Sequence, residues 1–226
     1  MVMKSTQKKI LIAGPCSLEG RIQAHEISNK CSELADKYGF DYYFKASFDK
    51  VRMMGFDTFV ATDSKRIAKH LPIKWCIKTS KANNGTHRLS KRVVLDLVGH
   101  YDYIINIQGD MIDINHETMK PILKALNDND YDCLTAYTKG YKPSDVKVLH
   151  ANNMAMWFTR SDIGYGDRHL GIYAYKPYVL KKYRRLQCEY DTFENLEQNR
   201  ILGLYDIDVV ETIYNGVEVN TYNDIK

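Results

Sequence analysis

The sequence lacks the cysteine pairs and long apolar runs that mark disulfide-rich and membrane-spanning proteins. It has five cysteines, an odd number, and none of them stands in a Cys-x-x-Cys pair. We therefore predict reduced thiols and a cytoplasmic location. No apolar run approaches the roughly 20 residues that a membrane span needs. The short run ILIAG at residues 10–14 is typical of a first strand rather than of a signal peptide.

A dense basic stripe is also missing. Lys and Arg number 32 against 28 Asp and Glu, which gives a net charge of +4. The basic residues are scattered, apart from a short cluster at residues 181–185. Because nucleic-acid-binding surfaces carry denser positive charge, we expect no nucleic-acid partner. The mild charge is compatible with a site for an anionic small molecule.

What the sequence does contain is an alternation of strand and helix signals. At 226 residues it fits one α/β domain, or one domain with an appendage. Apolar runs at residues 57–63, 101–108 and 170–175 alternate with helix-like segments such as 21–39 and 116–128. This alternation predicts an α/β fold built on a mainly parallel sheet.

The segment YDYIINIQGD, residues 101–110, ends an apolar run in a single carboxylate. Its nearly continuous isoleucines are typical of a strand that is buried on both faces of a parallel sheet. Such sheets bind ligands beyond the carboxyl ends of their strands, which is where Gln108 and Asp110 stand. Asp110 is therefore a candidate ligand for a hard divalent cation. A strand followed by an ordinary polar turn is the alternative.

The stretch NNGTHRLSKRVV is a candidate anion site. It places Gly85 and Thr86 just before a helix-like run, and Arg88 adds a fixed positive charge. Free amide donors at the start of a helix attract anions. An Asn-Gly turn before a helix is also commonplace, and this remains the alternative.

Two segments near the C-terminus carry candidate sugar ligands. His169 opens a predicted strand, and FENLEQNR places Glu197 and Gln198, with Glu194, on or beside one helical face. Carboxylates and amides at this spacing suit the hydroxyl groups of a sugar. A packed histidine and a solvated helix face are the alternatives.

Taken in order, eight segments closely resemble the 3-deoxy-manno-octulosonate cytidylyltransferases (CMP-KDO synthetases) over about residues 56–226. They are FVATDSKRIA, NNGTHRL, IINIQGD, DVKV, MWFTRS, RHLGIYAY, FENLEQNR and GVEVNTYNDI. The resemblance implies a nucleotidyltransferase-like (Rossmann-like) α/β fold, with a mixed, mainly parallel sheet flanked by helices. It also implies magnesium-dependent transfer of CMP from CTP to the sugar acid KDO, with release of pyrophosphate, for lipopolysaccharide or surface-glycan biosynthesis. The family's enzymes are commonly homodimers, so a homodimer is implied here as well.

The resemblance also assigns roles to individual residues. Asp110 and Arg160 are the expected catalytic residues, and Asp110 and Asn220 the expected magnesium ligands. The nucleotide is expected to contact Gly85, Thr86, Arg88 and Gln108. The sugar acid is expected to contact Arg160, His169, Tyr173, Glu197 and Gln198.

Three departures from the family pattern bear on activity. Where the family has the motif GTDR, this sequence has His87 instead of the aspartate. Where the family has its second magnesium-binding aspartate, this sequence has Asn220. Because carboxylate charge holds hard cations, we expect weaker magnesium binding. The loop of the form PARxxSxRLPxK, which binds the triphosphate in the family, is missing from this sequence. A weakened or non-catalytic protein that binds the sugar acid or nucleotide is therefore the alternative function.

The N-terminal segment resembles a different enzyme. KILIAGPCSLEG and DYYFKASFDK, within residues 8–50, resemble the start of KDO-8-phosphate synthase, a (β/α)₈ barrel. Two strands and a helix cannot close such a barrel, so we do not expect the synthase reaction. We predict a strand–helix–strand segment at residues 1–50, packed into the same sheet as a cytidylyltransferase-like domain at 51–226. In this arrangement ILIAG takes the position of the family's first strand.

Overall fold

The computed structural model describes residues 10–14, 54–69, 71–108, 111, 114–186 and 194–216. Its strands are β1 (Ile10–Gly14), β2 (Asp57–Thr62), β3 (Cys76–Lys78), β4 (Ile104–Gln108), β5 (Cys133–Thr138), β6 (Lys147–Ala151), β7 (Met154–Thr159), β8 (Asp167–Tyr175) and β9 (Ile207–Glu211). Its helices are α3 (Lys65–Lys69), the 3₁₀ helix η1 (Ile73–Trp75), α4 (Gly85–Leu89), α5 (Arg92–Val98), α6 (His116–Asp128), α7 (Pro177–Tyr183) and α9 (Glu197–Leu202).

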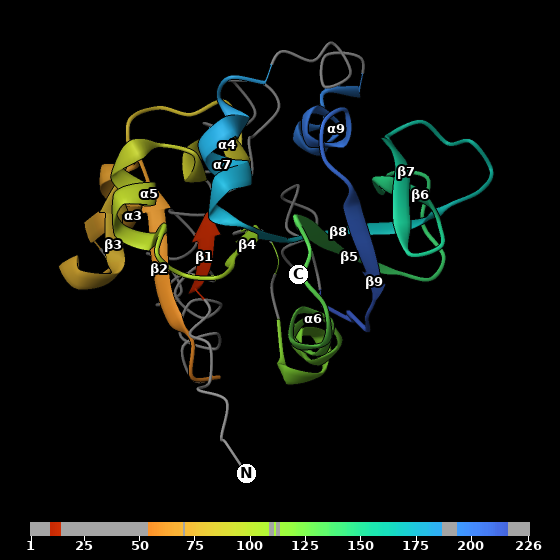
Figure 1. Ribbon diagram of the computed structural model, residues 1–226, viewed down its shortest axis with the longest axis horizontal. Helices are drawn as coiled ribbons and strands as arrows, with labels where there is room; N and C mark the ends of the chain where they lie inside the picture. The colour runs from red at the N-terminus through yellow and green to blue at the C-terminus, as the bar shows by residue number, and fades with distance from the viewer. Residues whose placement is uncertain are drawn as a thin grey trace, which may run out of the picture.

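The strands form one sheet in the order β3-β2-β1-β4-β8-β5-β9-β7-β6 (Figure 1). The half that contains β3, β2, β1 and β4 is parallel, so the carboxyl ends of these strands lie along one edge. The ILIAG strand β1 lies between β2 and β4, with Ile10 in register with Asp57 and Ile104. ILIAG therefore lies in the sheet beside β2, and its equivalence to the family's first strand remains a prediction. The division of the chain at residue 50 remains a prediction.

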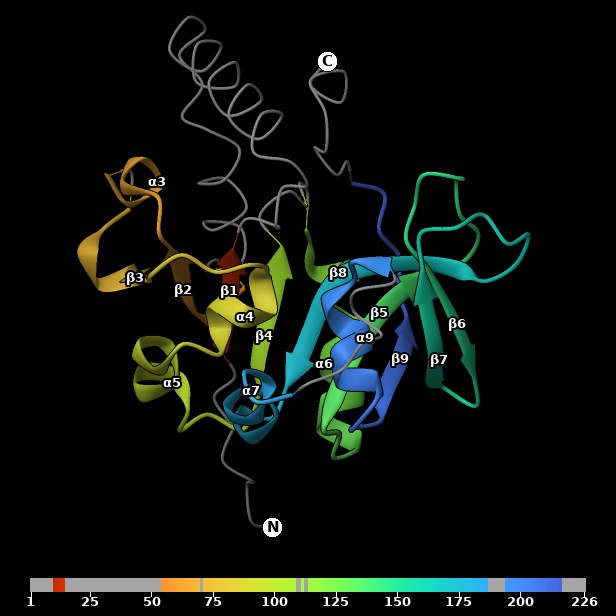
Figure 2. The same cartoon turned by 90° about the horizontal axis from the view of Figure 1, so that it is seen from above.

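The other half of the sheet is mostly antiparallel. Strand β8 runs antiparallel to both β4 and β5, and β9 pairs parallel with β5. Strands β6 and β7 form a hairpin at one end of the sheet, as Figure 2 shows from above. Its two loop residues, Asn152 and Asn153, have φ of 52° and 62°. Two-residue hairpin loops favour this left-handed backbone because it matches the twist of the strands, and asparagine tolerates it.

Helices cover both faces of the sheet. Helix α6 packs on one face, where Met119, Ile122 and Leu126 join the core formed by Ile105 and Ile107 of β4. Helices α4, α5, α7 and α9 lie on the opposite face, around a second core (Figure 1). The isoleucine run of β4 is buried on both faces because it lies between these two layers. The mixed α/β sheet flanked by helices is the predicted architecture, although its parallel pairings are confined mostly to one half.

Several local predictions hold with changed boundaries. The NNGTHRLSKRVV stretch forms two short helices, α4 and α5, rather than one. The FENLEQNR helix begins only at Glu197, because Leu196 is extended and Asn195 has a φ of 52°. Glu194 is itself helical, but the turn at Asn195 separates it from α9, so the two glutamates are not on one helix. The helix predicted at 21–39 and the strand predicted in DYYFKASF lie outside the described residues.

Candidate active site

The carboxyl end of β4 lies at the edge where the parallel strands end. The chain turns directly after this strand, since the Met111 N–H donates to the Gln108 carbonyl oxygen at 3.2 Å. Gln108 packs against Gly171 of β8, where an added Cβ would come within 2.9 Å of the Gln108 side chain. Asp110 and Asn220 lie outside the described residues. Within the described part of the chain, no group of three or more His, Cys, Asp or Glu side chains is suited to a metal ion.

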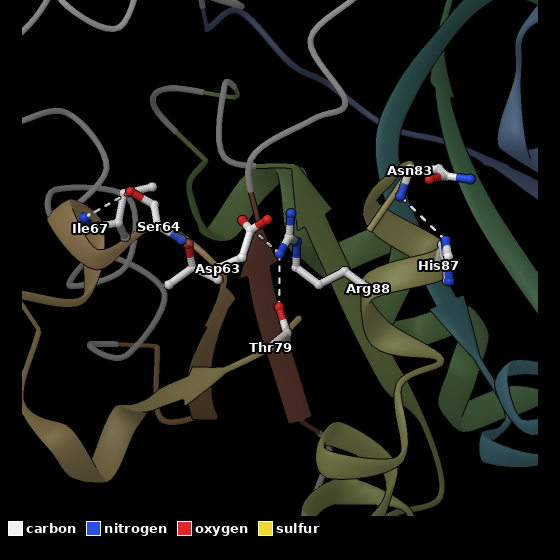
Figure 3. A network of polar contacts seen from close by, with 8 residues as sticks. Asp63, Ser64, Ile67, Thr79, Asn83, His87 and Arg88 are labelled. Atoms are coloured by element: carbon white, nitrogen blue, oxygen red, sulfur yellow. Dashed lines mark hydrogen bonds and ion pairs between the residues drawn. The ribbon is translucent and has the colours of Figure 1, made fainter. Parts of the chain in front are cut away.

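Helix α4 presents the GTHR segment beside this edge. Asn84 caps the helix, because its Oδ1 accepts a hydrogen bond from the His87 N–H at 2.6 Å. Thr86 is buried, and its Oγ1 lies 2.9 Å from the Tyr175 hydroxyl of β8. Figure 3 shows His87 and Arg88 on opposite sides of the helix; the His87 Nδ1 accepts from the Asn83 N–H at 3.3 Å. Histidine here supports the turn before α4.

Arg88 joins α4 to the ends of β2 and β3. Its guanidinium donates to Thr79 Oγ1 at 2.8 Å and pairs with Asp63 Oδ1 at 3.0 Å (Figure 3). The residue is 7% exposed, and its Nε is buried without a partner among the described residues. Arg88 thus positions the loops at the carboxyl edge of the sheet, and it keeps one unused donor there.

Glu197 brings the two predicted subsites into contact. Its Oε2 accepts a hydrogen bond from the Thr86 backbone N–H at 3.1 Å. Burial raises the pKa of this carboxyl from 4.5 to about 7, although hydrogen bonds from the Thr86 and Gly85 backbone oppose the rise. The site therefore contains a carboxyl group that titrates near neutral pH.

The second oxygen of Glu197 is buried beside another unsatisfied polar group. Glu197 Oε1 and Asn106 Nδ2 have no hydrogen-bond partner among the described residues. An added Cβ at Gly85 would lie 3.6 Å from the first atom and 3.4 Å from the second. Because unpaired buried polar groups are costly, this is a place where a water molecule or a ligand hydroxyl would be stabilised.

His169 and Tyr173 lie together on β8, with ring centroids 5.3 Å apart. The Thr135 hydroxyl donates to the Ile172 carbonyl at 2.8 Å, so its oxygen accepts from His169 Nε2 at 3.0 Å. The His169 proton therefore sits on Nε2 and leaves Nδ1 as an acceptor. Burial lowers the pKa of His169 to about 3, so the ring is neutral at physiological pH.

The remaining predicted sugar ligands are on β7 and α9. Arg160 directly follows β7 and is exposed, whereas Gln198 on α9 is buried. Helix α9 is joined to the end of β7 by the Asn199 side chain, whose Nδ2 donates to the Phe158 carbonyl at 3.0 Å. Of the predicted residues, the structure brings together Thr86 and Glu197 by a hydrogen bond, and His169 and Tyr173 by a contact between their rings. The roles of all the predicted site residues remain predictions.

Sequence reasoning missed several residues that support this site. Asn106, Thr135 and Tyr175 hold polar groups on the face of the sheet that carries His169 and Tyr173. A signal for Asn106 was present, because an amide stands in the middle of an otherwise apolar strand. Thr135 gave no comparable signal, since its role depends on how β5 and β8 pair.

Comparison with solved structures defines the class of fold. A CMP:2-keto-3-deoxy-manno-octonic acid synthetase complexed with CTP is similar, with a TM-score of 0.77 and 23% identity, covering 96% of this chain and 95% of that one. An inositol-1-phosphate CTP transferase from T. maritima has a TM-score of 0.66 and 11% identity, covering 99% and 94%. The chain therefore has a nucleotidyltransferase fold.

The cytidylyltransferase family model matches residues 45–215. A 3-deoxy-manno-octulosonate cytidylyltransferase of Fusobacterium nucleatum is 33% identical, over 74% of this chain and 76% of its own length. The same enzyme of Acaryochloris marina is 31% identical, over 75% and 77%. The chain belongs to the cytidylyltransferase family, and within it to the 3-deoxy-manno-octulosonate cytidylyltransferases.

The N-terminal part has a second similarity. The DAHP synthetase I family model matches residues 2–87, which overlaps the start of the cytidylyltransferase match. This match covers less than half of the chain and is distinct from the match that defines the family. Within the described residues, no helix has the length and apolar character needed to cross a membrane.

Proposed function

We propose that this protein transfers CMP from CTP to KDO or a related sugar acid and releases pyrophosphate, in lipopolysaccharide or surface-glycan biosynthesis. The observation that carries the proposal is the hydrogen bond between Thr86 and Glu197. It joins the segment that matches the family's nucleotide motif to the segment that matches its sugar-acid motif. Both lie on one face of the sheet, in a chain that belongs to this enzyme family.

On the nucleotide side, Gly85, Thr86, Arg88 and Gln108 would contact CTP. The buried Arg88 Nε, at the edge where the parallel strands end, has no acceptor among the described residues. Gly85 leaves open the space that a side chain would fill between Asn106 and Glu197. Ligands of open α/β sheets bind at this edge.

On the sugar side, Arg160 would pair with the carboxylate of the sugar acid, since a guanidinium matches a carboxylate in geometry and charge. His169, Tyr173, Glu197 and Gln198 would orient its hydroxyl groups. The neutral His169 offers Nδ1 as an acceptor for a hydroxyl proton. The attacking group is the anomeric hydroxyl, and binding by these residues would hold it near the α-phosphate of CTP.

Magnesium is the cofactor of this proposal, with Asp110 and Asn220 as its protein ligands. A carboxylate and an amide carbonyl are both oxygen donors of the kind that Mg²⁺ accepts, although the amide supplies no charge. When bound, the ion would neutralise charge that develops on the phosphates. We also propose a cytoplasmic location and a homodimer, on the grounds of the reduced thiols and the family resemblance.

The test is pyrophosphate release from CTP in the presence of KDO and magnesium. We expect turnover by the wild type and a loss of about 100-fold or more in Asp110→Ala, because the metal would lose its one charged ligand. Asp96→Ala is the matched control, since Asp96 is exposed on α5 and, within the described part of the chain, pairs with Arg92 alone. Equal background rates in all three proteins would contradict the proposed enzyme. Calorimetric titration with KDO would then test a protein that only binds the sugar acid.

A further inference from the structure

Both peptide groups that flank the Arg160 Cα are held by charged side chains. The Arg160 N–H donates to Glu194 Oε2 at 3.0 Å. The Arg160 carbonyl accepts from Lys147 Nζ at 2.9 Å. Hydrogen bonds to ionised groups are shorter and about twice as strong as neutral ones. The backbone of this residue is therefore fixed on both sides, and with it the direction in which its Cα–Cβ bond points.

Lys147 is the more unusual of the two supports. It is fully buried, at 0% exposure, yet it forms no ion pair with any of the described residues. Its ammonium donates three hydrogen bonds to carbonyl oxygens, to Pro143 at 2.8 Å and Asp145 at 2.7 Å besides Arg160. A buried charge is tolerated only when its hydrogen-bonding capacity is filled, and an ammonium has three donors. These three bonds use all of them and join the loop before β6 to the residue that follows β7.

Glu194 supplies a second contact to the same segment. Its Oε1 accepts from the Thr159 hydroxyl at 2.7 Å, and the same hydroxyl oxygen accepts from the Ser161 N–H at 3.0 Å. The peptide group between Arg160 and Ser161 is thus held at its carbonyl by Lys147 and at its N–H by Thr159. Glu194 therefore organises three consecutive residues from a position just before α9.

We propose that Glu194 and Lys147 are positioning residues for Arg160. They set the direction of the Arg160 side chain and its distance from α9, which carries Glu197 and Gln198. This inference rests on the proposed function, in which Arg160 binds the carboxylate of the sugar acid and α9 binds its hydroxyl groups. The sugar acid would then contact both the end of β7 and α9, and Glu194 fixes the distance between these two elements.

A neighbouring contact supports this arrangement. The Asn199 Nδ2 of α9 donates to the Phe158 carbonyl of β7, two residues before Arg160. The end of β7 is therefore held twice, by Asn199 in the first turn of α9 and by Glu194 just before the helix. Substrate ligands that are held by such supporting bonds keep their geometry, and small misplacements reduce binding strongly.

The experiment compares Glu194→Gln and Glu194→Ala with the wild type. We expect a rise of about 10-fold in KM for KDO in Glu194→Ala and a smaller rise in Glu194→Gln, with KM for CTP changed less than twofold. Glu117→Gln is the matched control, because Glu117 is exposed in the first turn of α6. The rate of amide hydrogen exchange at Arg160, measured by NMR, should increase in Glu194→Ala and stay unchanged in the control.

A second pair of variants tests the same bonds without removing charge. Thr159→Val keeps the shape of the side chain but loses its hydroxyl, whereas Thr159→Ser keeps the hydroxyl. We expect Thr159→Val to raise KM for KDO and the exchange rate at Ser161, and Thr159→Ser to restore both. Equal rises in both KM values, or unchanged exchange at Arg160 in Glu194→Ala, would overturn the positioning role. Absence of pyrophosphate release by the wild type would instead overturn the proposed function, while the exchange rates would still decide whether these bonds hold the Arg160 backbone.

Discussion

Glu197 carries the most informative ionisation among the described residues. Its pKa is raised to about 7 by burial, so the folded protein binds a proton more tightly than the unfolded chain does. The stability from this group is therefore complete below about pH 4.5 and is lost as the pH rises through 7. A shift from 4.5 to about 7 corresponds to about 3 kcal/mol.

We predict that Glu197→Gln removes this pH dependence. At pH 5 the variant and the wild type should have similar free energies of unfolding, since a protonated carboxyl and an amide are both neutral. By pH 8 the variant should be the more stable, by up to about 3 kcal/mol. Urea unfolding at several pH values measures the difference. A difference that stays constant from pH 5 to pH 8 would contradict the assigned pKa.

Gly171 offers a test of the Gln108 position. An added Cβ would come within 2.9 Å of the Gln108 Cδ, so Gly171→Ala must displace that side chain. We expect a rise of several-fold in KM for CTP with little loss of stability, because the displaced atoms are the end of a flexible side chain. The double variant with Gln108→Ala is the control. In that background Gly171→Ala should leave KM for CTP unchanged, and a further increase would show that Gly171 acts elsewhere.

At this scale the sequence predicted residue types better than contacts. The motifs singled out Thr86 and Glu197 separately, but the hydrogen bond between them depends on how α4 and α9 pack on the sheet. The position of the proton on His169 depends on Thr135, which contacts the ring where the register between β5 and β8 shifts. Pairings between distant strands are not encoded in any local pattern, so these contacts could not be predicted from the sequence.

At the scale of elements, the β6–β7 hairpin depends on two asparagines with left-handed backbone. Left-handed conformations cost a β-branched residue roughly 1–2 kcal/mol, whereas glycine adopts them freely. We predict that Asn153→Val lowers the free energy of unfolding by about that amount and that Asn153→Gly leaves it equal or slightly higher. Met156→Val is the control, because Met156 is exposed on an extended strand. Equal effects of the two valine substitutions would argue against a turn-specific cost.

The order of the elements was only partly predictable. Apolar runs located most of the strands, and the alternation with helices predicted a mainly parallel sheet, which describes the half that contains β1 to β4. The antiparallel placement of β8 between β4 and β5 could not be predicted, because a strand buried on both faces has the same composition in either direction. Glu194, predicted to lie on or beside the helical face of Glu197 and Gln198, lies beside it, since the positive φ at Asn195 separates it from α9.

For the molecule as a whole, β1 is the strand on which the parallel half depends. It pairs with β2 on one side and with β4 on the other. We predict that Ile12→Pro prevents folding, because proline removes a backbone donor and is excluded from central strands. Circular dichroism and size-exclusion chromatography would detect the loss.

A proline placed elsewhere serves as the control for this prediction. Ile73 is 92% exposed at the first position of η1, and Pro72 before it already has the extended ψ of 137° that a following proline requires. Ile73→Pro should therefore fold like the wild type. Normal folding of Ile12→Pro would show that β1 is dispensable.

The central place of β1 also has a consequence for how such a chain can arise. Its residues fall in the part that matches the DAHP synthetase I family, yet they complete the sheet of a cytidylyltransferase. Any extended segment with free backbone groups and apolar side chains can pair in a parallel sheet, whichever family the segment resembles. Recombination between genes can therefore exchange a strand and keep the fold, while the loop that travelled with the original strand, and the chemistry of that loop, is lost.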